Sequence, residues 1–141
     1  MTDTRLLADD ARRLLDELDR DLPGAAMSSG ECRPALDIIE TADGAEVVVD
    51  VAGLPAAALR VAIRRDTVLV VGAKLAPATP ADVRFHLAER NYGRFARAVR
   101  VTGAFDASRA RAIVHNGLLR VVLPRIEDRR GHLMHLDVET E

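Results

Sequence analysis

Four histidines are the first candidates for chemistry in this chain, because a neutral imidazole is a common metal ligand. His132 and His135 have a spacing that occurs in metal-binding motifs, and His86 and His115 are the other two. The closely spaced pair has no cysteine pair beside it, whereas structural zinc sites use four protein ligands. We therefore expect no metal site, and we place His132 and His135 on a solvated tail.

Nucleophiles and phosphate-binding loops are equally weak signals. Ser28, Ser29 and Ser108 lie in loop-like segments outside any Gly-x-Ser-x-Gly turn. The glycines form no phosphate-cradling pattern. Cys32 is the only cysteine, so an internal disulfide is excluded, and in a reducing compartment an inert thiol is expected rather than a link between chains. We expect neither an enzyme nor a cofactor.

Arg97 is the polar residue whose position matters most. Alternate residues of the segment FARAVRV share one side of an extended strand, namely Phe95, Arg97, Val99 and Val101. A charge on such an apolar face must be paired, because burying it alone costs several kcal/mol. An exposed Arg97 is the alternative, and Arg100 on the opposite side is the better candidate for ordinary solvation.

An amphipathic helix is expected from about residue 4 to residue 22. Its apolar residues recur at three- and four-residue steps, at Leu7, Ala11, Leu14, Leu18 and Leu22. Acids and arginines fill the other positions, and Pro23-Gly24 ends the helix. The small and polar residues that follow are typical of a linker.

The region from about residue 34 to residue 124 has the two-residue period of β-strands. Segments such as AEVVVDVAG, LRVAIRR and LLRVVLP are rich in aliphatic residues and are separated by turn residues. Asp43-Gly44, Arg65-Asp66 and Asn116-Gly117 are the expected turns, and the last pair suits a primed turn with positive φ at both positions. Many short strands of this kind predict an antiparallel β-sandwich. Its last strand should face the core through Leu119, Val121 and Leu123.

The chain as a whole has the size and charge of one globular domain. Its 141 residues can bury a single core, which must be aliphatic because aromatic residues make up 3% of the chain. The net charge of -2 gives no electrostatic footprint for nucleic acid. No apolar run reaches the roughly 18–20 residues of a membrane span, and residues 1–15 lack the apolar stretch of a secretory signal. We expect a soluble cytoplasmic protein that binds neither nucleic acid nor membrane.

Two segments carry apolar residues without an evident core around them. Val83, Phe85 and Leu87 alternate within a long loop, as in an extended strand. A structureless loop of roughly 20 residues is improbable in a compact domain, so this segment should pair with a strand, of another subunit or of its own sheet. Leu136 and Val138 near the C-terminus point to the same side of an extended chain.

Four stretches together are more specific than any one of them. They are ALDIIETADGAEVVVDVAGL, ERNYGRFARAVRV, DASRARAIVHNGLLRVVLP and the tail motif LDV. In this order they resemble the α-crystallin-type small heat-shock protein family. The resemblance implies an all-β fold, an immunoglobulin-like antiparallel β-sandwich, at residues 34–125. An N-terminal arm at residues 1–33 and a flexible C-terminal tail at residues 126–141 would flank it.

The family resemblance also implies a function and the surfaces that serve it. Members are ATP-independent holdase chaperones, which bind unfolding client proteins and assemble as dimers by strand exchange or as larger homo-oligomers. The implied dimer interface comprises Leu36, Ile38, Val83, Phe85, Leu87, Glu89 and Arg97. Leu136 and Val138 would plug a groove formed by Leu59, Val61, Ile63, Ala110 and Ala112. Client proteins would contact the helix at Leu7, Leu14 and Leu18.

A scaffold with the same sandwich that binds one fixed partner is the alternative function. The N-terminal arm has no phenylalanine or tryptophan, whereas aromatic residues in this arm serve client contact in many members of the family. This feature favours the adaptor.

Overall fold

The structure is a computed structural model that describes residues 4–21, 32–126, 136–138 and 140. Its elements are α1 (Thr4–Asp21), β1 (Leu36–Glu40), β2 (Gly44–Asp50), β3 (Leu59–Arg64), β4 (Thr67–Lys74), β5 (Gly93–Arg100), β6 (Arg111–His115) and β7 (Leu118–Pro124). Two short 3-10 helices, η1 (Ala56–Ala58) and η2 (Ala107–Arg109), precede β3 and β6. The expected linker and most of the expected tail, with His132 and His135, lie outside the described residues.

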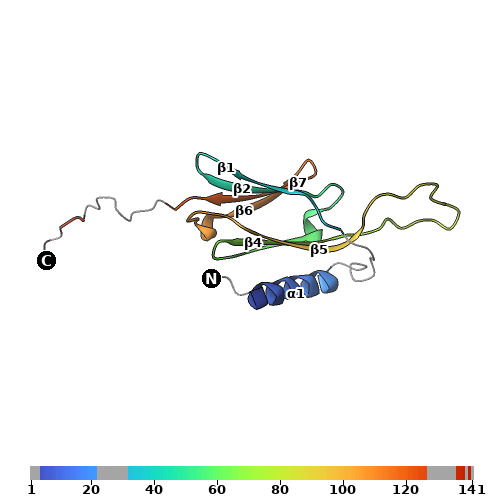
Figure 1. Cartoon of the computed structure of the whole chain (residues 1–141), viewed down its shortest axis with the longest axis horizontal. Coiled ribbons are helices and arrows are strands. Elements are labelled where there is room, and N and C mark those ends of the chain that lie inside the picture. Colours follow the sequence, from blue (N-terminus) through green and yellow to red (C-terminus); the bar gives the residue numbers. More distant parts are fainter. Residues whose placement is uncertain (1–3, 22–31, 127–135, 139, 141) are drawn as a thin grey trace.

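The strands pair antiparallel in two sheets that stack as two layers (Figure 1). One sheet has the order β1-β2-β7-β6 and the other the order β3-β4-β5. Alternate side chains of both sheets point inward and form an aliphatic core, which includes Val47, Val49, Val68, Val70, Leu119, Val121 and Leu123. The predicted antiparallel β-sandwich is therefore confirmed, and the three inward residues of β7 are buried as expected.

Two of the three predicted turns have the expected residues. Asn116 and Gly117 have φ values of 52° and 76°, as a primed hairpin turn requires. Arg65 has a φ of 56° in the turn between β3 and β4. The first hairpin differs, because residues 41–43 form its turn and Gly44 already belongs to β2. A Cβ atom at Gly44 would collide with the backbone carbonyl oxygen of Leu123, so this glycine permits the close approach of β7.

The helix α1 covers the outer face of the β3-β4-β5 sheet (Figure 1). Its apolar stripe packs on Leu69 and Val71, which point away from the sandwich core. β4 is consequently buried on both faces along nearly its whole length. In the described part of the chain, α1 thus adds a third layer to the two sheets, and β4 is the central strand of the middle layer.

Residues 75–92 connect β4 to β5 and project beyond the sandwich (Figure 1). The segment contains no strand within the single chain, although all of it is described. Nowhere in the described ranges does a helix have the length and apolar character needed to cross a membrane.

Candidate functional site

The predicted dimer surface consists of two segments that expose apolar side chains. β1 is the outermost strand of its sheet, so one edge of it has no partner strand among the described residues. Ile38 on β1 is exposed and Leu36 is half-buried. All predicted interface residues of the projecting loop are exposed, namely Val83, Phe85, Leu87 and Glu89. The loop does not fold back on its own sheet, and its exchange between subunits stays a prediction.

Arg97 is half-buried on the inner face of β5. It lies opposite Val70 in the strand register, between the buried Phe95 and Val101. Its Nη1 donates a hydrogen bond of 2.7 Å to the backbone carbonyl oxygen of Pro34, just before β1. None of the ion pairs within the described residues involves Arg97. Among the described residues, the partner of this charge is therefore a backbone carbonyl oxygen, which links the edges of the two sheets. The role of Arg97 in a dimer interface stays a prediction.

The predicted groove lies at the opposite side of the sandwich from this contact. β3 and β6 are the outer strands there, since β5 faces β1 across the layers. Ala112 pairs with the core residue Val121, so its side chain points inward, yet it is exposed. Val61 and Ile63 of β3 also point inward and remain half-buried. β3 and β6 thus leave inward-facing apolar side chains uncovered between the two sheet edges.

The remaining predicted groove residues are more covered, whereas the predicted tail residues are exposed. Leu59 is buried and Ala110 is half-buried against the core. Leu136 and Val138 are exposed to 82% and 96%. The insertion of these tail residues into the groove of another subunit stays a prediction.

The residues predicted to contact clients lie on the face of α1 that covers the sheet. Leu18 is 0% exposed and packs against Leu69 and Val71. Leu14 and Leu7 are half-buried. Leu18 can therefore meet another protein only after α1 has left the sheet, and its contact with clients stays a prediction under that condition.

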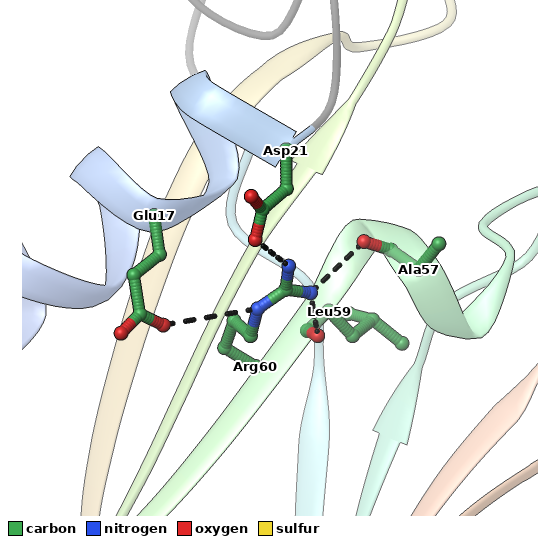
Figure 2. A network of polar contacts seen from close by, with 5 residues as sticks. All are labelled: Glu17, Asp21, Ala57, Leu59 and Arg60. Atoms are coloured by element: carbon green, nitrogen blue, oxygen red, sulfur yellow. Dashed lines mark hydrogen bonds and ion pairs between the residues drawn. The ribbon is translucent and has the colours of Figure 1, made fainter.

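Arg60, near the start of β3, binds the C-terminal end of α1 (Figure 2). Its Nη2 donates a hydrogen bond of 3.0 Å to Asp21 Oδ2, and its Nε lies 3.9 Å from Glu17 Oε2. Its Nη1 donates to the backbone carbonyl oxygens of Ala57 and Leu59 over 3.0 and 2.8 Å. These backbone contacts fix the guanidinium group, so that it is oriented toward the helix carboxylates.

Two further ion pairs hold α1 on both flanks. Arg64 of β3 donates from Nε and Nη2 to the two carboxylate oxygens of Asp10, over 2.6 and 3.0 Å. These hydrogen bonds hold the pKa of the Asp10 carboxyl below its ordinary value. Arg94 of β5 donates to Asp19 Oδ2 over 3.0 Å. The other oxygen of Asp19, Oδ1, is buried and has no hydrogen-bond partner within the described residues.

The N-terminal half of α1 packs less completely than the half around Leu18. A cavity of about 300 Å³ lies between this half and the sheet, and Leu7, Leu14, Ile63 and Leu69 contribute to its lining. Leu7 and Leu14 are only half-buried there, so docking removes less of their apolar surface from water than it does for the fully buried Leu18. The docking of α1 thus depends strongly on the region around Leu18.

The docking surface of α1 is the part of the site that sequence analysis missed. The signal was present in TVLVVGAK, whose uninterrupted apolar run is typical of a strand buried on both faces. The arginines that pair with α1 gave no separate signal, because arginine is spread along the whole sequence.

Comparison with known proteins agrees with this geometry. Residues 37–138 match the model of the Hsp20/alpha crystallin family. The chain is 31% identical over 141 residues to the 21.9 kDa heat shock protein of Oryza sativa, covering 89% of this chain and 68% of that protein. It is 28% identical to the 18.9 kDa heat shock protein of the same species over 77% of this chain, and it spans only 62% of that protein's length.

Solved structures show the same fold at lower identity. Heat shock protein 16.0 from Schizosaccharomyces pombe superposes with a TM-score of 0.65 at 24% identity, over 79% of this chain and 100% of that one. A small heat-shock protein from Xylella fastidiosa, whose crystal structure is described as a distinct high order structure, gives 0.63 at 22% identity over 77% and 98%. With the family model matching most of the chain, this protein belongs to the Hsp20/alpha crystallin family of small heat shock proteins.

Proposed function

We propose that this protein is an ATP-independent holdase, which binds unfolding proteins through apolar surface and limits their aggregation. The observation that supports this most directly is a group of large apolar side chains on the surface, among them Ile38, Val83, Phe85, Leu87, Leu136 and Val138. Exposed apolar surface of this kind marks sites of interaction with other proteins. The names of the curated relatives, which are heat shock proteins, agree with a role under conditions that unfold proteins.

Aggregation of two unrelated client proteins on heating tests this function. Light scattering of each client is followed with and without the chain, and an equal mass of an inert globular protein serves as the control. A holdase suppresses scattering of both clients. The lack of aromatic residues in α1 favours an adaptor for one fixed partner as the second candidate, and an adaptor protects neither client.

Self-association by strand exchange is the assembly that we propose. The unpaired edge of β1 offers backbone donors and acceptors, and the extended segment Val83–Leu87 offers a complementary strand with exposed apolar side chains. The X. fastidiosa relative described with a high order structure is consistent with association of the subunits.

Deletion of residues 82–90 tests the exchange. The variant should sediment as a monomer, because both the backbone hydrogen bonds and the apolar contacts of the exchanged segment are lost. A variant in which glycine and serine replace the same residues keeps the loop length and should also be monomeric. A dimer mass for both variants would show that another surface joins the subunits.

The tail and groove are proposed as the link between dimers. Changing Leu136 and Val138 to alanine should convert larger assemblies into dimers while the sandwich stays folded. Asp137→Ala is the matched control, because Asp137 points to the other side of an extended chain. Size-exclusion chromatography with light scattering separates the outcomes, and a parent-like mass for the double variant contradicts the role of the tail.

A further inference from the structure

The outer face of the β3-β4-β5 sheet has a regular pattern of large and small side chains. Leu69 of β4 lies between Ala62 of β3 and Ala98 of β5 in the strand register. Val71 of β4 likewise lies beside Ala96 of β5. Because three of the four flanking residues are alanines and the fourth is Arg60, the two large side chains form an apolar strip along β4. We call this strip the outer strip, and α1 lies on it.

Arginines stand at the four corners of the outer strip. They are the first and last outward-facing positions of β3 and β5, namely Arg60, Arg64, Arg94 and Arg100. We call them the arginine frame. Three of them pair with carboxylates of α1, and Arg100 pairs with Asp66 of the adjacent turn over 2.6 Å. Guanidinium groups around an apolar strip favour a ligand that has an apolar stripe with carboxylates on both of its flanks.

α1 has this pattern, but it fills the surface imperfectly. Leu18 is its one fully buried side chain among those described, and a cavity remains under its N-terminal half. The Asp19 Oδ1 atom is buried without a hydrogen-bond partner within the described residues, which costs free energy. Asp21 and Arg64 of the ion pairs are well exposed, so salt screens these contacts. The contact between α1 and the strip is therefore suited to exchange.

We propose that the outer strip and the arginine frame form a binding surface for acidic amphipathic helical segments of unfolding client proteins. α1 is the resident occupant of this surface, and a client segment replaces it. The inference rests on the proposed holdase function and names a chemical class of client segment for it. An unfolding protein presents amphipathic segments whose apolar stripe has lost its partner, and those with flanking carboxylates match the frame.

The tether between α1 and the sandwich sets the conditions for replacement. Because α1 and the sandwich belong to one chain, docking of the helix is intramolecular, and a short tether gives an effective local concentration on the order of millimolar. A weakly binding segment therefore reaches the outer strip only when α1 is displaced or weakened. The full-length parent should bind such segments less tightly than a variant whose own helix is released.

Peptide binding to the full chain tests the surface, with fluorescence anisotropy as the readout. The first probe is a labelled peptide of residues 4–21. The second is a designed peptide with a different sequence but the same positions of leucine and carboxylate, and the third is its counterpart with arginine in place of the flanking acids. The protein variants are Leu14→Ser with Leu18→Ser, which releases α1 through its apolar stripe, and Asp10→Arg with Asp21→Arg, which releases it through its charges. Circular dichroism verifies that each sandwich is folded.

Both released variants should bind both acidic peptides at least about tenfold more tightly than the parent does. Adding Arg60→Glu and Arg64→Glu to the variant released through Leu14 and Leu18 should weaken this binding by about tenfold or more and should favour the basic peptide. Arg111→Glu, an exposed arginine on the other sheet, is the control and should change neither affinity. Equal affinities of the parent and the released variants, or no effect of the Arg60 and Arg64 changes, would overturn the proposal.

Two further outcomes separate this inference from its alternatives. Binding of the 4–21 peptide without binding of the designed acidic peptide assigns the surface to the helix of a second copy and overturns the client proposal. Suppression of client aggregation without binding of either acidic peptide overturns this inference alone. Failure to suppress aggregation of either client overturns the proposed function instead, and it is measured independently of the anisotropy.

Discussion

The docking of α1 makes a direct prediction for the substitution Leu18→Ala. Leu18 is 0% exposed and packs against Leu69 and Val71 of β4. The substitution keeps a good helix former at this position, so helix propensity does not fall. Any loss of docking must then come from lost packing against Leu69 and Val71.

The size of the effect follows from the apolar surface that is removed. Truncation of leucine to alanine loses about 2–3 kcal/mol at roughly 0.8 kcal/mol per carbon atom, and leucine-to-alanine changes in rigid cores reach about 5 kcal/mol. A surface helix can detach instead of leaving a cavity, so the loss of global stability cannot exceed the free energy of docking. A loss of about 2–3 kcal/mol lowers the ratio of docked to undocked helix by roughly 30- to 150-fold.

Hydrogen exchange measured by mass spectrometry detects this change. Amides of α1 should exchange much faster in Leu18→Ala, because an isolated helix of this length is marginal in water. The inner strands should keep most of their protection. Leu6→Ala is the matched control, since Leu6 lies on the same helix and is 44% exposed. Equal protection of α1 in the two variants would refute the view that Leu18 anchors the helix.

Three other predictions concern pH, packing and the inner arginine. The hydrogen bond from Arg64 lowers the pKa of Asp10 in the folded state, so the contribution of this ion pair to docking is complete above the ordinary aspartate pKa and is lost as the pH falls through the lowered value. Helical circular dichroism should therefore fall only below about pH 4. Asp10→Asn should weaken docking at neutral pH and remove this acid step. Gly72→Ala should lower the free energy of unfolding by about 1–3 kcal/mol, because the new Cβ would lie 2.7 Å from Cε1 of Phe95; a urea midpoint equal to that of the parent contradicts this packing. Arg97→Ala should cost about 1.5–3 kcal/mol through loss of its hydrogen bond to the carbonyl before β1, and a concentration-dependent, larger loss would instead indicate a carboxylate partner in a second subunit.

The sandwich could be predicted because the alternation of apolar residues along the strands and the turn residues between the strands favour the same fold. Leu119, Val121 and Leu123 alternate inward along β7, and Asn116-Gly117 supplies the turn that the hairpin needs. The role of Gly44 could not be predicted in the same way. Its lack of a side chain serves the approach of β7, a strand far away in the sequence, and not the turn beside it.

The position of α1 on the sandwich could not be predicted from the sequence pattern either. The amphipathic period predicts a helix with one apolar stripe, but it does not say which surface the stripe covers. That surface depends on the register of β3, β4 and β5, which places Arg60 and Arg64 on the same side as Leu69. The half-buried state of Arg97 likewise depends on where Pro34 lies in space.

Because α1 packs unevenly along its length, the force needed to detach it should depend on the end at which it is pulled. Asp10 and Asp21 pair with opposite ends of β3, so the helix runs antiparallel to that strand and lies along it. The cavity lies at the N-terminal end of this contact and the Leu18 anchor toward the other end. Force applied to the N-terminal end of α1 opens the weak contacts one after another, whereas force applied at Asp21 must break the anchor and the Arg60 cluster at once. We therefore expect α1 to detach at lower force when it is pulled from its N-terminal end than when it is pulled at Asp21.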